Sequence, residues 1–73
     1  MNARRYPVII EPTSTGYSAY SPDVPGCAAV GDSEEETRRS FQEALVLHFE
    51  AMRELGEPIP VPYSSVDYVE VTA

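Results

Sequence analysis

The chain has 73 residues, 42% of them hydrophobic, and this length accommodates one domain with a small core. Twelve acidic residues oppose five basic ones, for a formal net charge of −7, which argues against direct nucleic-acid binding and favours a basic protein partner. A single cysteine, Cys27, excludes an internal disulfide and is typical of a reducing cytoplasm, and no apolar run approaches the roughly 20 residues that span a bilayer.

Two strands and a turn are predicted at the start of the chain. Residues 6–11 place Tyr6, Val8 and Ile10 on one face, and their β-branched content predicts a strand. Residues 12–16 (PTSTG) form a turn cluster, and residues 17–21 a second strand, so the two strands indicate a hairpin. Residues 21–26 (SPDVPG) predict a rigid connection, with a type II turn at Pro25-Gly26, before a short third strand over residues 27–30.

A long helix is predicted after the third strand. Ser33 and Glu36 form a capping box, three glutamates follow the cap, and the helix should run to Leu55 with Gly56 as its stop. Apolar side chains recur at spacings of three and four, which indicates a buried stripe in the core or in a dimer contact. The stripe consists of Phe41, Leu45, His48, Met52 and Leu55.

The helix is longer than the strands beneath it. It should measure about 33 Å, against about 20 Å for strands of five or six residues. Its second half should therefore overhang the sheet and need cover, so we expect a homodimer or a larger homo-oligomer. Residues 57–63 (EPIPVPY) must be extended, and residues 65–71 should form the last strand. The element order is β-β-β-α-β in one α+β domain over residues 1–73.

Several residues have an alternative chemical interpretation. His48 could be a metal ligand or a catalytic base, but its place in the apolar stripe indicates a packing role. Cys27 could be a nucleophile with His48 as its base, although a small buried hydrophobe explains it as well. Three converging carboxylates, Asp23, Asp32 and Glu35, could hold Mg²⁺ in a metal-dependent nuclease remnant, although capping and turn formation also account for them.

The combined pattern resembles the HicB-like antitoxin domain family. The matching segments are YPVIIEP, GYSAYSPDVPGCAAVGDSEEE and LGEPIPVP, and they cover nearly the whole chain. The resemblance implies a partial RNase H-like fold in which a three-stranded antiparallel meander is followed by a helix packed on one sheet face. A fourth strand then lies beside the first. It also implies that the metal-binding carboxylates of true RNase H enzymes are lost.

The resemblance further implies an antitoxin that binds and neutralises a HicA-like toxin, a small basic ribonuclease that cleaves mRNA. Many family members carry an additional C-terminal DNA-binding segment that the present sequence does not contain, so direct DNA binding is not expected. We expect no catalytic residues, no metal and no cofactor. The alternative from the residues alone is a stand-alone dimeric binding module for another ligand. The candidate partner-binding residues are Tyr20, Asp23, Val24, Pro25, Asp32, Glu34 and Glu35.

Overall fold

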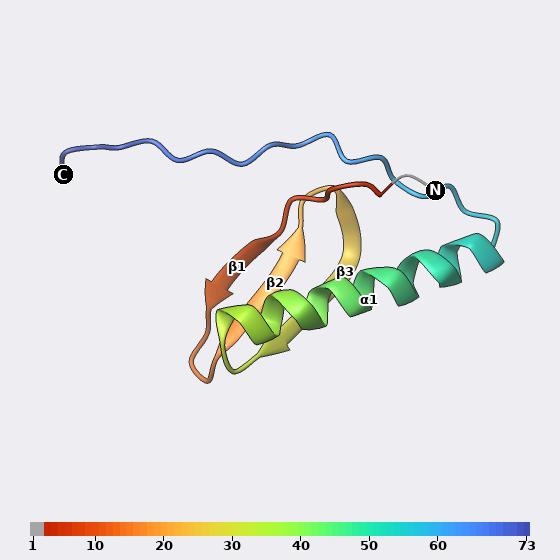
Figure 1. Ribbon diagram of the computed structural model, residues 1–73, viewed down its shortest axis with the longest axis horizontal. Coiled ribbons are helices and arrows are strands. Elements are labelled where there is room, and N and C mark those ends of the chain that lie inside the picture. Colours follow the sequence, from red (N-terminus) through yellow and green to blue (C-terminus); the bar gives the residue numbers. More distant parts are fainter. Residues whose placement is uncertain (1–2) are drawn as a thin grey trace.

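The computed structural model describes residues 3–73. Strands β1 (Ile9–Pro12), β2 (Tyr17–Ser21) and β3 (Val24–Gly31) precede one helix, α1 (Glu34–Glu54). The strands form an antiparallel sheet in the order β1-β2-β3, and α1 covers one face of it (Figure 1). The predicted α+β class, with a three-stranded meander followed by a helix, is confirmed. Within residues 3–73, no helix has the length and apolarity needed to cross a membrane.

The β1–β2 hairpin is confirmed, but β1 begins later than predicted. Its register pairs Ile9 with Tyr20 and Pro12 with Tyr17, so the strand covers residues 9–12 rather than 6–11. Pro7 explains part of the difference, because a proline offers no N–H to a sheet ladder. The turn that closes the hairpin is held by the backbone N–H of Thr13, which donates to the carbonyl of Gly16 at 2.8 Å.

Strand β3 begins earlier than predicted and carries a bulge. Ser21 pairs with Val24 and Tyr20 pairs with Ala28, so residues 25–27 are extra on the β3 side. Gly26 lies within this bulge at φ +84°, a backbone conformation that glycine adopts without steric cost. The predicted strand over residues 27–30 is therefore the continuous part of a longer, bent strand.

Both ends of α1 agree with the local signals in the sequence. The Ser33 hydroxyl accepts a hydrogen bond from the backbone N–H of Glu36 at 3.1 Å. At the other end Leu55 is the C-cap and Gly56 has φ +73°. The N–H of Gly56 donates to the carbonyl of Arg53 and that of Glu57 to the carbonyl of Met52, the two bonds of a Schellman motif.

The core lies between the sheet and the first half of α1. Its buried apolar residues are Ala19, Val24, Cys27 and Phe41. Of the predicted stripe, Leu45 packs against this cluster, and His48 and Met52 are half-buried. Leu55 is 73% exposed, so it does not belong to the core of the single chain, and the alternative of a dimer contact stays a prediction for it. The second half of the stripe lies beyond the sheet because α1 extends past the ends of the strands (Figure 1).

The half of α1 that extends past the sheet is partly covered by other segments of the same chain. The ring of Phe49 lies 5.2 Å from the ring of Tyr6, centroid to centroid. The Tyr6 hydroxyl in turn donates to the carbonyl of Pro60 at 2.5 Å, which holds the proline-rich segment over the N-terminal residues. The cover that we expected from a second protomer is thus supplied in part within one protomer.

The predicted last strand is not formed. No strand is present in residues 57–73, and residues 65–71 run in an extended path away from the sheet (Figure 1). The physical reason is the lack of a neighbour: a strand exists only where its backbone groups pair with another strand. The four-stranded β-β-β-α-β arrangement is therefore corrected to β-β-β-α for the described single chain.

Candidate functional site

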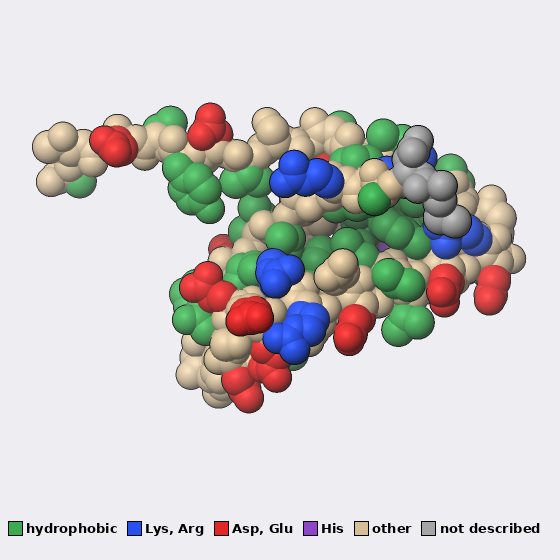
Figure 2. Space-filling view, in the orientation of Figure 1, with side chains coloured by type: hydrophobic (Ala, Val, Ile, Leu, Met, Phe, Trp, Pro, Cys, Tyr) green, Lys and Arg blue, Asp and Glu red, His purple; other side chains and the backbone are tan. Residues whose placement is uncertain are grey.

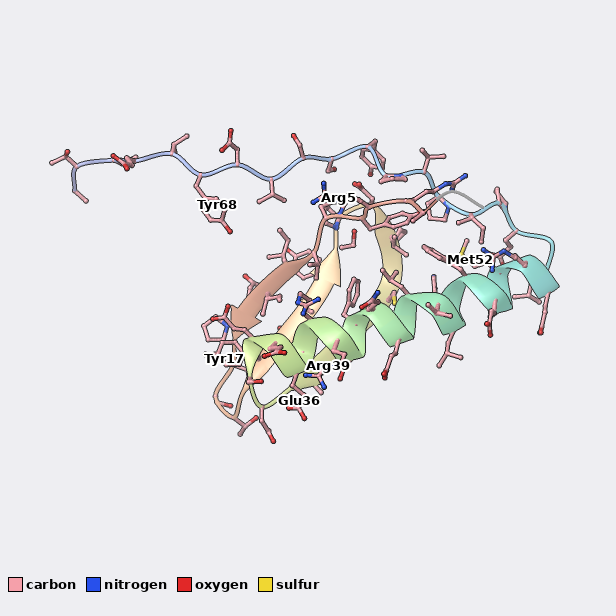
Figure 3. The ribbon with its side chains drawn as sticks, viewed as in Figure 1. Arg5, Tyr17, Glu36, Arg39, Met52 and Tyr68 are labelled. Carbon is pink, nitrogen blue, oxygen red and sulfur yellow. The ribbon has the colours of Figure 1, made fainter. Side chains whose placement is uncertain are left out.

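A cluster of acidic residues lies where β3 passes into α1. Asp32, Glu34, Glu35 and Glu36 are exposed there within five residues of one another. Figure 2 shows acidic side chains gathered at this end of the molecule, with arginine side chains beside them. Figure 3 labels Glu36 and Arg39 on the first turns of α1.

Two of these carboxylates already have partners within the chain. The Glu36 carboxylate accepts a hydrogen bond from the backbone N–H of Asp32 at 2.6 Å and so helps to cap the helix. An oxygen of Glu35 lies 3.5 Å from a guanidinium nitrogen of Arg39, one turn further along. Both side chains of this pair are mostly exposed, so the pair is weak and can rearrange when a partner binds.

A second group of candidate residues lies at the opposite end of β3. Pro25 is exposed in the bulge, and Tyr20 is 43% exposed on β2, where it pairs with Ile9 and Ala28. Val24 is only 1% exposed and belongs to the core. The side chain of Val24 is therefore not accessible to a partner in this structure.

Asp23 has a role that the sequence did not reveal. It is 2% exposed, and its carboxylate accepts three hydrogen bonds from the segment after α1. Both backbone N–H groups, of Tyr63 and Ser64, donate to Oδ2 at 2.9 Å, and the Ser64 hydroxyl donates to Oδ1 at 2.5 Å. The side chain thus joins the β2–β3 connection to a segment 40 residues further along the chain.

The pKa of Asp23 reflects the same contacts. Burial by itself would raise the pKa of this carboxyl group, but the hydrogen bonds from the Ser64 hydroxyl and from the backbone of Ser64 and Tyr63 favour the charged form. Together they lower the pKa below its ordinary value of 3.8. Asp23 is therefore ionised at neutral pH and acts as a structural acceptor.

The three carboxylates proposed for a metal site do not converge. Asp23 precedes β3 and Asp32 follows it, and the eight residues of the strand separate them. At about 3.3 Å per residue a regular strand of this length measures roughly 26 Å, and even when the bulge shortens it the separation is far more than one ion can bridge. Within residues 3–73 no three His, Cys, Asp or Glu side chains are grouped in a way that could hold a metal ion. The residues named for the nuclease-remnant hypothesis, Asp23, Asp32 and Glu35, are therefore not brought together in the described part of the chain.

Cys27 lies in the core rather than in a cleft. It is 8% exposed and packs with Ala19, Val24 and Phe41. Burial raises the pKa of its thiol, so the group remains protonated at neutral pH. This environment is that of a small hydrophobic residue in the core.

The fold and these contacts define a small acidic α+β domain with an exposed cluster of carboxylates at the start of its helix. Comparison with known proteins identifies the family. Residues 6–72 match the family described as "HicB_like antitoxin of bacterial toxin-antitoxin system", and the chain belongs to this family. The match begins at Tyr6, which packs against Phe49, and continues past Ser64, which Asp23 holds.

Curated relatives show the same relationship. The chain is 41% identical to Antitoxin HicB 1 and 39% identical to Antitoxin HicB 2 of Photorhabdus laumondii, over 92% and 94% of its length. It is also 42% identical, over 75% of its length, to an uncharacterized 14.9 kDa protein of Haemophilus phage HP1. The matched parts are 44%, 50% and 41% of these proteins, so the chain spans half of their length or less.

Two solved structures share the fold. One is the HicA3 and HicB3 toxin-antitoxin complex, with a TM-score of 0.72 and 33% identity over 82% of this chain and 70% of the matched one. The other is the Antitoxin HicB3 crystal structure, with a TM-score of 0.68 and 33% identity over 82% of this chain and 44% of the matched one.

Proposed function

We propose that this protein is an antitoxin that binds and neutralises a small basic HicA-like toxin that cleaves mRNA. The observation that carries the proposal is membership of the HicB-like family over residues 6–72, together with similarity to a HicB protein solved in complex with its HicA toxin. The protein then acts by occupying the toxin surface rather than by catalysis, and it acts in the cytoplasm, where mRNA is cleaved.

The charge of the chain supports this role. A net charge of −7 on 73 residues attracts a basic partner over a distance of one Debye length, about 8 Å at physiological salt. Charge complementarity of this kind accelerates association and disfavours binding of acidic proteins. The carboxylates of Asp32 and Glu34 are exposed, and Glu35 is held only by an exposed ion pair.

We assign the toxin contact to the exposed members of the predicted set. Asp32, Glu34 and Glu35 supply charge at the start of α1, and Tyr20 and Pro25 supply apolar contact at the other end of β3. Asp23 and Val24 contribute indirectly, because their buried side chains fix the connection that presents Pro25.

The test is a charge reversal at the proposed contact. The double variant Glu34→Lys with Glu35→Lys should bind the toxin about tenfold or more weakly, because it replaces attraction by repulsion at the interface. The matched control is Glu50→Lys with Glu54→Lys, which makes the same change in net charge on exposed residues near the other end of α1. Binding is measured by titration calorimetry with the purified toxin.

The control separates a local contact from a general charge effect. A much larger loss for the first pair than for the second supports the assigned contact. Equal losses would show that only net charge matters and would overturn the assignment. Complete retention of binding in both variants would contradict electrostatic recognition altogether.

A further inference from the structure

We propose that a hollow beside the second half of α1 binds an alkyl carboxylate, the chemistry of a medium-chain fatty acid. The hollow measures about 540 Å³, which is within the size range of small-molecule sites in proteins. It lies apart from the acidic cluster at the start of α1, so the inference does not depend on toxin binding.

Three segments that lie side by side form the walls of this hollow (Figure 1). They are the N-terminal residues, the second half of α1, and Ile59 in the proline-rich segment of residues 57–63. The ring of Tyr6 packs on Phe49 of α1, and the Tyr6 hydroxyl donates to the carbonyl of Pro60. The N-terminal wall is therefore fixed relative to both of the others.

One side of α1 supplies the floor of the hollow. The spacing of the lining residues along the helix places them on the same side of it. They are Gln42, Leu45, Val46, Phe49 and Arg53. From the first to the last of them the helix rises about 16 Å, at 1.5 Å per residue. An alkyl chain is long and narrow, so it matches a floor of this shape better than a compact polar molecule does.

The surface between the two ends of the floor is apolar. Leu45 and Phe49 are half-buried against the core, and Val46 is 54% exposed. Ile59 adds an aliphatic side chain from the opposite wall. Figure 2 shows apolar side chains gathered between the proline-rich segment and the second half of α1. An alkyl chain that covers these side chains removes apolar surface from water on both molecules, which favours binding.

Two arginines determine the charge of the ligand. Arg4 and Arg53 both line the hollow, whereas none of its lining residues within residues 3–73 is acidic. Two of the five basic residues are thus found at one place in a chain with twelve acidic residues. The ion pair in the described part of the chain joins Arg39 to Glu35, so both guanidinium groups at the hollow are available to an anion.

A carboxylate suits these arginines better than a more highly charged anion. A guanidinium group can donate two parallel hydrogen bonds to one carboxylate. The net charge of −7 repels a ligand more strongly with each negative charge that the ligand carries. Glu50 and Glu54, which are close to Arg53 on α1 without lining the hollow, add to this repulsion. A single carboxylate is therefore the favoured head group.

The test is a titration of the chain without toxin, with decanoate as the ligand and backbone amide shifts as the readout. Decanoate should shift the amides of Leu45, Val46 and Phe49 saturably. Acetate has the head group without the chain, and decyltrimethylammonium has the chain with the opposite charge, so neither should shift them at the same concentrations. The absence of saturable shifts with decanoate, or equal shifts with the cation, would overturn the proposal.

An apolar tetrapeptide with a free carboxyl terminus distinguishes a fatty acid from the end of a protein chain. The tetrapeptide should shift the same amides less than decanoate does at equal concentration, because its peptide groups lose hydrogen bonds to water in an apolar hollow. Saturation of these amides by the tetrapeptide but not by decanoate would overturn the assignment of the ligand.

A charge variant with a matched control tests the contact with the head group. Arg53→Gln should weaken decanoate binding about three- to tenfold, because it removes one of the two guanidinium groups. Arg39→Gln makes the same change in net charge on an exposed residue of α1 that does not line the hollow, and it should leave the affinity nearly unchanged. Equal losses in the two variants would show that only net charge matters and would refute the site.

A second pair of variants tests the apolar floor. Val46→Glu places a carboxylate in the hollow and should abolish saturable binding of decanoate. Leu47→Glu is the control, because Leu47 is 66% exposed and does not line the hollow. Circular dichroism of both variants should equal that of the unchanged chain, since both positions are exposed. Unchanged decanoate affinity in Val46→Glu would contradict the proposal, whereas a failed toxin titration would bear only on the proposed function.

Discussion

At the scale of single residues, Asp23 shows how one side chain can join distant parts of a small domain. It is buried between the sheet and the segment after α1, and three donors satisfy its carboxylate. A buried carboxylate without partners would be strongly unfavourable, so the fold and the path of residues 63–64 depend on each other.

Replacing Asp23 by asparagine should therefore loosen the segment after α1. The amide keeps one acceptor oxygen, but its NH₂ group would face a donor that the carboxylate now satisfies. We expect a lower unfolding midpoint in urea and faster hydrogen exchange at the amides of Tyr63 and Ser64. Asp67→Asn is the control, because Asp67 is exposed and its carboxylate accepts a local hydrogen bond from the neighbouring N–H of Tyr68.

The lowered pKa of Asp23 predicts how stability depends on pH. Because the folded-state pKa lies below the ordinary 3.8, the unfolded chain binds a proton more readily than the folded one. The stabilisation that ionised Asp23 provides is thus complete above the ordinary pKa of 3.8, and it is lost as pH falls through the lower pKa of the folded state. The free energy of unfolding, measured in urea at pH 3 and at pH 6, should differ less between the two pH values for Asp23→Asn than for the unchanged chain. An identical difference would contradict this role.

Gly16 lies so close to the backbone of Gly31 that there is no space for a side chain at position 16. A Cβ atom on Gly16 would lie 2.3 Å from the carbonyl oxygen of Gly31, a backbone atom that cannot move aside without shifting β3. We expect Gly16→Ala to lower the free energy of unfolding by about 1–3 kcal/mol, in the range of other overpacked sites. Ser14→Ala, in the same exposed turn, should change it by less than about 0.5 kcal/mol.

At the scale of elements, α1 was predicted almost to the residue because its signals are local. Ser33, Glu36 and Gly56 each act within a few residues of themselves, so their pattern can be interpreted without the rest of the fold. The strands were predicted less accurately. The bulge at residues 25–27 depends on how β3 meets β2, and no local pattern encodes that register.

The helix cap can be tested directly. Ser33→Ala removes the acceptor for the N–H of Glu36 and should cost about 1 kcal/mol of stability. The loss is measured as a shift of the urea midpoint, with the slope of the transition unchanged. Ser65→Ala serves as the control, since it makes the same substitution at an exposed position outside the helix. Equal stability of the two variants would show that the cap contributes nothing.

The segment after α1 is the element that the sequence predicted least well. The alternation over residues 65–71 predicted a strand, but no strand is formed there in the structure, because alternation alone does not provide a pairing neighbour. The anchors that direct the segment, Asp23 for residues 63–64 and Tyr6 for Pro60, act across about 40 to 54 positions of the chain. Long-range contacts of this kind leave no spacing pattern in a single sequence. The packing of Phe49 against Tyr6 is also long-range, and for this reason it was not predicted.

At the scale of the whole molecule, charge and family membership both support the proposed function. The acidic cluster at the start of α1 is exposed, and the remaining acidic residues keep the net charge at −7. The candidate contact residues lie in two groups at opposite ends of β3, so a toxin that touches both must span the length of the sheet. The sequence identified the exposed acidic group, but not the burial of Asp23 and Val24.

The most direct test of the central claim is capture of the natural partner at low salt, followed by an RNA-cleavage assay. The account predicts recovery of a small basic protein that is released as salt rises, because screening weakens the attraction between exposed charges. Its cleavage of RNA should stop when an equal amount of this chain is added. Recovery of the chain alone, or a recovered ribonuclease whose activity the chain does not reduce, would contradict the claim.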